Sequence, residues 1–303
     1  MSVIECTDLS KRYGRLQALN QLSLSIKENK MIGLVGRNGA GKTTLLKLIA
    51  GFIRPTSGEV KVFSGNPFNS LRVSANSIFI DDEMSMPAAL TLQEILKEAG
   101  RFYEKWDEEL ANRLFDYFSF DPRAYHGQLS KGMKSTFNMI LGLASRCPLT
   151  IFDEPTTGMD AAVRKDFYRA LLKEYIAYPR TIIVSSHHLN EIEDVLEDVL
   201  LINDGKVRLH LPVSELKEWA VGLTGKISSL RKWTEGMEII HENEAGPGRA
   251  YIVMKNDFSP DQLQQMRQDG IESASVSASD VCVYLTNRGE GGIDNVFHRH
   301  ELV

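Results

Sequence analysis

The chain has 303 residues, of which 43% are hydrophobic and 25% charged, so it can form one large folded domain and a smaller one. Its net charge of −5 gives no basic excess, and we therefore expect no nucleic acid partner. Cys6, Cys147 and Cys282 form no disulfide or metal-binding pattern and indicate thiols in a reducing compartment. Because the sequence shows neither a signal-peptide pattern nor an apolar run of membrane-spanning length, we expect a cytoplasmic protein.

The first residues predict antiparallel strands with one buried face. Val3 to Cys6 and Leu22 to Ile26 each predict such a strand, and the second segment alternates apolar and polar residues. Tyr13 lies between these segments, and its ring could stack on an adenine base. The alternative is a tyrosine on an edge strand that binds nothing.

A glycine-rich segment follows a predicted buried strand at Met31 to Val35 and precedes an apolar-faced helix at Thr44 to Ala50. It fits the pattern G-x-x-x-x-G-K-[ST], the P-loop, whose backbone N–H groups and following helix N-terminus bind phosphates. We expect Lys42 to contact the β- and γ-phosphates and Thr43 to bind Mg²⁺. The predicted nucleotide-binding residues of this loop are Gly36, Asn38, Gly39, Ala40, Gly41, Lys42, Thr43 and Thr44.

The middle of the chain predicts a helical insert. A short strand at Ser77 to Ile80 leads into an acidic cluster, and from Leu90 apolar residues recur at helical spacing. Ser130 is a suitable N-cap for a further helix, and Gly132 would leave its backbone N–H groups open. This segment is either a second phosphate site or an ordinary capped helix.

Two buried strands then end in polar residues. The strand that starts at Leu149 ends in Asp153 and Glu154, of which the first would hold Mg²⁺ and the second would activate water. The strand that starts at Thr181 ends in a histidine pair, and we expect His187 to donate to the γ-phosphate. This order of strands and helices predicts parallel βαβ units with the ligand at the carboxyl ends of the strands.

These motifs together resemble the ATP-binding subunit of ABC transporters over roughly residues 2–210. The resemblance implies an α/β fold, with a P-loop NTPase core, an antiparallel β subdomain and a helical insert at about 88–147. It implies that Lys42, Glu154 and His187 serve catalysis, that Thr43, Asp153 and the Q-loop residue hold Mg²⁺, and that ATP is the nucleotide. The remaining expected nucleotide contacts are the A-loop Tyr13, Ser130 and Gly132 of the signature motif and the D-loop Asp160.

The sequence departs from the family pattern at two places. The signature motif is usually L-S-G-G-Q, whereas Lys131 and Met133 occupy its third and fifth positions here. The family usually has a Q-loop glutamine where we align Asp82, with Asp81 or Glu83 as alternatives. A carboxylate there could still reach Mg²⁺ but adds negative charge beside a polyphosphate.

The resemblance also implies partners. Each ATP would lie between the P-loop of one subunit and the signature motif of another, in a homodimer or heterodimer that opens after hydrolysis. The dimer would drive a separately encoded membrane permease, which we expect to be an exporter, from the inner face of the cell membrane. The alternatives are a nucleotide-dependent regulatory module and a soluble ABC ATPase outside transport.

Residues 211–303 predict a small C-terminal α+β accessory domain. Its expected helices are Ser214 to Ala220 and Pro260 to Arg267, and its expected strands are Ile239 to His241, Arg249 to Met254 and Asp280 to Leu285. A dimerisation or packing element and a small-molecule sensor are both open. The terminal His298-Arg299-His300-Glu301 could suggest a metal site, but a solvated terminus is the expected reading because no other ligands accompany it.

Overall fold

The computed structural model describes residues 2–287. Its chain divides into two compact units, with the boundary between Val213 and Ser214, near the expected boundary at residue 210. His298 to Glu301 lies outside the described residues. Among the described residues, no helix has both the length and the apolar character needed to cross a membrane.

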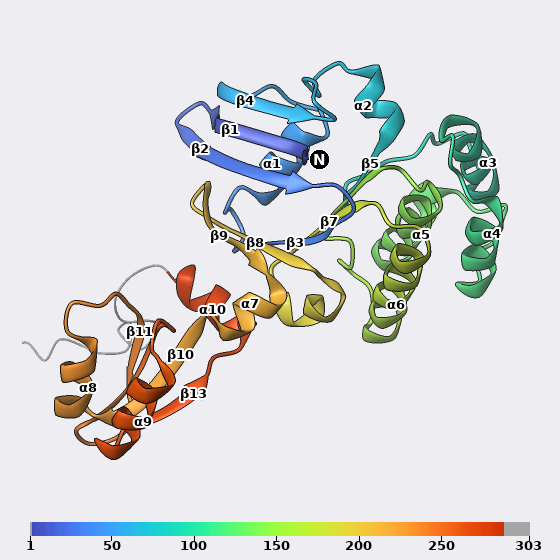
Figure 1. Cartoon of the computed structure of the whole chain (residues 1–303). Coiled ribbons are helices and arrows are strands. Elements are labelled where there is room, and N and C mark those ends of the chain that lie inside the picture. The colour runs from blue at the N-terminus through green and yellow to red at the C-terminus, as the bar shows by residue number, and fades with distance from the viewer. Residues whose placement is uncertain (1, 288–303) are drawn as a thin grey trace, which may run out of the picture. The chain divides into compact units, whose positions relative to one another are not determined.

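The first unit begins with a three-stranded antiparallel sheet in the order β2-β1-β4 (Figure 1). Its strands are β1 (Ser2–Tyr13), β2 (Leu16–Lys27) and β4 (Ser57–Val62). The first two are longer than the alternating segments predict, because shifts in pairing register let them continue through polar residues. Leu9 and Leu22, which are buried and paired, anchor the middle of the ribbon.

A six-stranded sheet forms the centre of this unit in the order β5-β6-β7-β3-β8-β9. Its strands are β3 (Met31–Val35), β5 (Ser77–Ile80), β6 (Leu149–Asp153), β7 (Thr181–Ser186), β8 (Asp198–Asn203) and β9 (Lys206–Pro212). The first five in spatial order are parallel, and β9 returns antiparallel through a turn at Asp204 and Gly205. Consequently the residues after β3, β5, β6 and β7 gather at one edge of the sheet.

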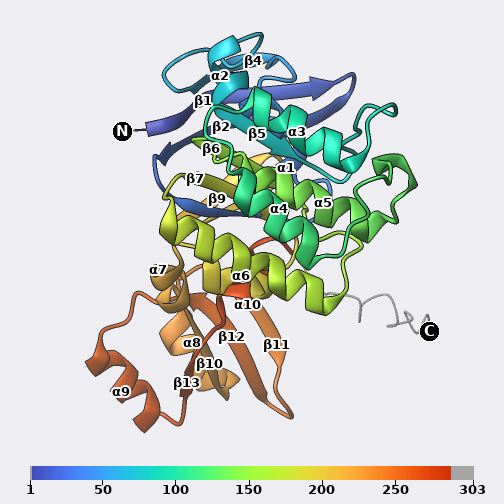
Figure 2. The ribbon, with the colours of Figure 1, turned by 90° about the vertical axis from the view of Figure 1, so that its right-hand side faces the viewer.

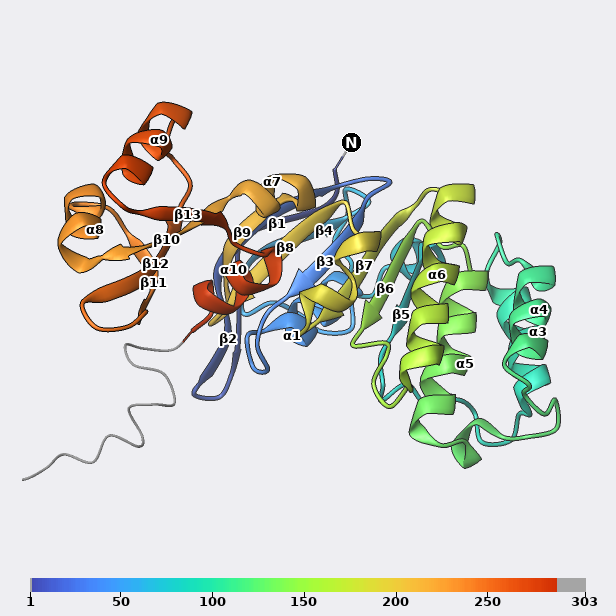
Figure 3. The ribbon, with the colours of Figure 1, turned by 90° about the horizontal axis from the view of Figure 1, so that it is seen from below.

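Six α-helices complete the first unit: α1 (Lys42–Ile49), α2 (Leu71–Asn76), α3 (Leu92–Phe102), α4 (Glu108–Tyr117), α5 (Lys131–Ala144) and α6 (Ala161–Ala177). Helix α1 packs between the two sheets, where Leu45 and Leu46 join a core shared with β1, β2 and β3. Helix α5 contacts β5 and β6 on one side and α4 on the other, as Figure 3 shows. The helical insert is therefore attached to the sheet through α5.

The helical insert contains two helices before α5, α3 and α4, separated near Trp106. Thr91 and Glu94 form a capping box at the start of α3, and Asp107 caps α4 by accepting from the backbone N–H of Leu110 at 2.8 Å. These caps define where each helix begins. Figure 2 shows α3 and α4 beside α5.

The second unit contains a four-stranded antiparallel sheet in the order β11-β12-β10-β13. Its elements are α7 (Val213–Glu218), β10 (Ala220–Lys226), α8 (Ile227–Thr234), β11 (Ile239–Glu244), β12 (Arg249–Lys255), α9 (Pro260–Gln268), β13 (Glu272–Ser275) and α10 (Ala278–Leu285). From β10 to β13 this is the ferredoxin-like βαββαβ arrangement. Leu230 of α8 and Met266 of α9 pack with Leu223 and Ile252 in its core.

The predicted strand at Asp280 to Leu285 is wrong, because this segment lies in helix α10. The run of apolar residues suggested a strand, but Ser277 accepts a hydrogen bond from the Asp280 backbone N–H at 3.0 Å and caps a helix. Ala278, Val281 and Cys282 are the buried residues, which is helical rather than alternating spacing. Strands β10 and β13 and helix α8 were not predicted from the sequence.

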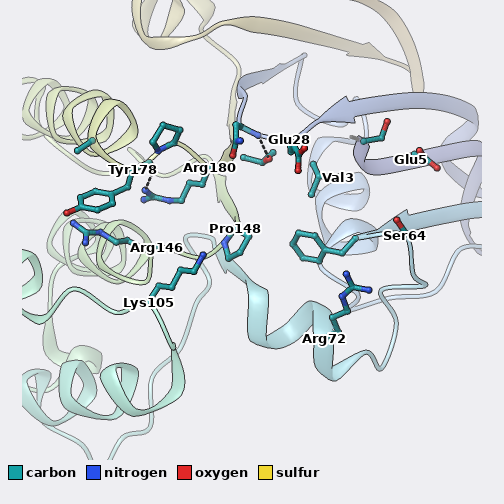
Figure 4. Close-up of a pocket in the computed structure, with 16 residues that line it drawn as sticks. Val3, Glu5, Glu28, Ser64, Arg72, Lys105, Arg146, Pro148, Tyr178 and Arg180 are labelled. Carbon is teal, nitrogen blue, oxygen red and sulfur yellow. Dashed lines mark hydrogen bonds between the residues drawn. The ribbon is translucent and has the colours of Figure 1, made fainter.

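A buried ion-pair network joins the insert to α6. Glu174, whose side chain is 8% exposed, contacts Arg146 at 2.7 Å and Arg180 at 3.6 Å. Arg146 also pairs with the α4 cap Asp107 and stacks on the ring of Tyr178. These arginines line a cavity of about 640 Å³, which also receives Lys105 and Arg72 and lies where β6 and β7 begin (Figure 4).

We expect Glu174→Gln to lower the free energy of unfolding by about 3 kcal/mol, because the substitution leaves the buried Arg180 without its ionic partner. Urea unfolding would measure the change. The matched control is Glu109→Gln, which removes an exposed helical ion pair with Arg113 and should cost less than about 0.5 kcal/mol. Equal losses in the two variants would contradict a stabilising role for the buried network.

Candidate functional site

The glycine-rich loop between β3 and α1 lies at the edge of the sheet where the parallel strands end. Gly41 caps α1 with a φ of 106°, a conformation that L side chains rarely adopt, and a Cβ there would lie 2.6 Å from the Ala18 carbonyl oxygen. A Cβ at Gly36 would lie 2.4 Å from the Ile202 carbonyl oxygen. Glycine is thus required at both positions by close backbone packing. Asn38 and Gly39 are exposed, whereas Ala40 is buried.

Lys42 opens α1 with its side chain buried in this loop. Its Nζ donates to the Gly36 carbonyl oxygen at 2.7 Å and lies 3.3 Å from Oε1 of Glu154. The second contact is an ion pair without hydrogen-bond geometry, since Oε1 has no hydrogen-bond partner among the described residues. The loop therefore holds the ammonium group of Lys42 beside the end of β6. Thr43 is exposed, and Thr44 is half-buried.

Glu154 follows β6 and has a φ of 48°, an uncommon value for a residue with a side chain. Its Oε2 lies 2.9 Å from Nδ1 of His187, the first residue after β7. The carboxylate is thus placed between Lys42 and His187. Glu154 therefore contacts two residues predicted from separate motifs, one after β3 and one after β7.

Ser185 is a site residue that the sequence analysis missed. It is buried in β7, donates its hydroxyl to Asp153 and accepts a hydrogen bond from the Glu154 backbone N–H at 2.9 Å. One hydroxyl thereby fixes both acidic residues. The available signal was a small polar residue near the end of an otherwise apolar, β-branched strand.

The amino end of α5 forms a second part of the site. Ser130 caps the helix by accepting from the Met133 backbone N–H at 3.3 Å. A Cβ at Gly132 would lie 2.3 Å from the Gly158 carbonyl oxygen, so this glycine lets α5 pack against the loop after β6. The same loop ends at Asp160, which caps α6 with hydrogen bonds from Ala162 and Val163 at 2.9 Å. Gly132 is therefore packed against the loop that leads to Asp160, whereas Ser130 and Asp160 are themselves exposed.

Two predicted residues lie apart from these contacts. Tyr13 is 47% exposed at the end of β1, and Lys11 Nζ lies 5.2 Å from its ring centroid. Asp82 follows β5 and forms an ion pair at 2.9 Å with Lys131, the first residue of α5. The carboxylate aligned with the Q-loop and the lysine in the signature motif thus contact each other.

The residues present are suitable for Mg²⁺. Asp153 is 4% exposed at the end of β6, and Thr43 lies in the first turn of α1. Within residues 2–287 no group of three or more His, Cys, Asp or Glu side chains could hold a metal ion by itself. Mg²⁺ at nucleotide sites needs only one or two protein ligands, because substrate phosphates and water complete its octahedral shell.

Comparison with known proteins identifies a shared family. Residues 19–157 match the family model of the ABC transporter. The bacitracin transport ATP-binding protein BcrA of Bacillus licheniformis is 30% identical over 273 residues, covering 89% of this chain and 84% of BcrA. The SkfA peptide export ATP-binding protein SkfE of Bacillus subtilis is 28% identical over 240 residues, covering 78% of this chain and all of SkfE.

A solved dimeric ATP-binding cassette, bound to ADP and Pi, has the same fold with a TM-score of 0.59. It is 20% identical, and the match covers 69% of this chain and 98% of the cassette. The fold and the P-loop define a nucleotide-binding ATPase. The chain belongs to the family of ATP-binding subunits of ABC transporters.

We expect Gly132→Ala to lower the free energy of unfolding by about 1–3 kcal/mol, because the added methyl group must displace the backbone at Gly158. Chemical denaturation would measure the loss. Gly127→Ala is the matched control, since a Cβ at Gly127 meets no atom within 4 Å. If both variants were as stable as the original chain, the close packing of α5 on this loop would be refuted.

Proposed function

We propose that this chain is the ATP-hydrolysing subunit of an exporter whose membrane-spanning permease is a separate chain. The observation that carries the proposal is the contact of Glu154 with both Lys42 and His187 at the ends of three neighbouring strands. Family membership supplies the nucleotide, ATP. The names of the relatives BcrA and SkfE, which refer to bacitracin transport and peptide export, favour export.

In this proposal the P-loop residues from Gly36 to Thr44 surround the phosphates, and Lys42 donates to the β- and γ-phosphate oxygens. Thr43 and Asp153 would hold Mg²⁺, which would supply positive charge to offset that of the phosphate oxygens. Glu154 accepts a proton from the attacking water, and His187 donates to the γ-phosphate. Ser185 keeps Glu154 in place through the bond to its backbone N–H. Tyr13 stacks on the adenine.

The remaining predicted contacts belong to a second subunit. Ser130 and Gly132 present the amino end of α5, where backbone N–H groups and the helix dipole favour a phosphate. Asp160 caps α6 and follows the loop on which Gly132 packs. We propose that ATP joins two such chains head to tail, as a homodimer or with a second ATP-binding subunit, and that hydrolysis releases them. The dimer would bind its permease at the inner face of the cell membrane.

We expect Glu154→Gln to lower the ATPase rate at least about a hundredfold while ATP still binds, because the amide cannot accept the proton from water. Phosphate release assays would measure the rate. The control Glu98→Gln removes an exposed, paired carboxylate on α3 and should keep the original rate. A wild-type chain as slow as Glu154→Gln would contradict the motor function and favour a nucleotide-dependent regulatory module.

The Glu154→Gln chain should also form a dimer in ATP and Mg²⁺, since the nucleotide that joins the subunits is no longer consumed. Light scattering with and without ATP would measure its mass. Persistent monomers would contradict the self-paired dimer and leave only pairing with a different subunit.

Purification from membranes tests whether the chain associates with a separate permease. We expect the tagged chain to retain an integral membrane protein with several spans after mild detergent extraction. Recovery with ribosomes or DNA, and without a membrane protein, would instead indicate a soluble ABC ATPase outside transport.

A further inference from the structure

An ion pair connects the loop after β5 with the first residue of α5. Lys131 Nζ lies 2.9 Å from Oδ2 of Asp82, and the side chains are 59% and 35% exposed. These are two of the positions at which the sequence departs from the family pattern. Their direct contact shows that the two departures complement each other in charge.

The start of α5 is an unfavourable place for a lysine. The helix dipole places partial positive charge at the amino end, and α5 has no acidic residue in its first turn. The carboxylate of Asp82 supplies the missing negative charge from a different element. The position of Lys131 in the helix is therefore electrostatically unfavourable, and the ion pair with Asp82 offsets this cost.

The partner loop lies beside the nucleotide end of the sheet. Strands β5 and β6 are parallel neighbours, and Ile80 pairs in register with Phe152, immediately before Asp153. Asp81 and Asp153 thus directly follow residues that pair in register on the two strands. The Asp82–Lys131 pair thus extends from the edge that carries the metal-binding carboxylate to the helix end that carries Ser130.

We propose that the Asp82–Lys131 ion pair positions the amino end of α5 relative to the nucleotide bound by the same chain, and that Asp82 acts through Lys131 rather than as a ligand of Mg²⁺. This deepens the proposed function and depends on it. Asp82 and Lys131 are then positioning residues: they set where Ser130 and Gly132 meet the nucleotide of the partner subunit. A carboxylate at the Q-loop position becomes compatible with a polyphosphate, because Lys131 balances its charge.

Enzyme kinetics of a charge-exchange series test the proposal. Asp82→Asn and Lys131→Gln should each lower kcat for ATP about two- to fivefold, the range expected for a partly exposed ion pair, and change KM less. The double variant Asp82→Asn/Lys131→Gln should be no slower than either single variant. The exchange Asp82→Lys/Lys131→Asp should recover at least half of the lost rate, and all differences should shrink in high salt.

Lys134→Gln is the matched control, since it removes a lysine one turn further along α5, and it should keep the original kcat. Thermal unfolding without nucleotide gives a readout independent of activity. At low salt, the Tm loss of the double variant Asp82→Asn/Lys131→Gln should be about 1–2 °C smaller than the sum of the losses of the two single variants. Additive effects in both kinetics and unfolding would overturn the proposal.

The Mg²⁺ concentration for half-maximal rate separates the two roles of Asp82. Under the proposal, this concentration in each single variant stays within twofold of its value in the unmodified chain. A rise in Asp82→Asn alone would overturn the proposal and make Asp82 a metal ligand. These results are distinct from failure of the proposed function, which would appear as an ATPase rate in the unmodified chain no higher than that of Glu154→Gln.

Discussion

The charge balance around Glu154 is the constraint on which the rest of the site depends. Its carboxylate lies between Lys42, which is buried, and His187, which is exposed, at the ends of three neighbouring strands. A lysine that is only 6% exposed needs a negative partner, and the carboxylate supplies it at 3.3 Å. The strained backbone of Glu154 is held by Ser185, whose hydroxyl also binds Asp153. The parallel pairing of β3, β7 and β6 therefore brings Lys42, His187 and the two acidic residues Asp153 and Glu154 together.

The helical insert is joined to this centre through α5. Most of α5 is buried, and its amino end packs so closely on the loop after β6 that only glycine is accommodated at position 132. At its other end, Arg146 and Arg180 converge on Glu174 of α6. A movement of α5 therefore has to move the loop that carries Glu154 and Asp160. In the proposed dimer, this packing would link the loop that carries Glu154 to the amino end of α5, which faces the partner subunit.

Asp82 and Lys131 show how a fold can accommodate residues that its family pattern disfavours. Each residue alone adds an uncompensated charge, one in the loop after β5 and one at a helix amino end. Together they form an ion pair across two elements. The second unit presents a different case: its ferredoxin-like sheet has a complete core of its own, with Leu223, Ile252 and Met266 among its members. That core accounts for a separate small α+β unit.

The sequence by itself determined the motifs and most of the parallel strands. Glycine spacing around Lys42, the apolar strands before Asp153 and His187, and the N-cap at Ser130 are local signals, because each depends on residues a few positions apart. Ser277 caps helix α10, and this signal was present in the sequence. The apolar run that follows it led instead to the prediction of a strand. Only the tertiary structure decided that Ser185 fixes both acids and that Asp82 meets Lys131. Those contacts join residues that are distant in the chain, and no local pattern encodes which strand ends become neighbours once the sheet has formed.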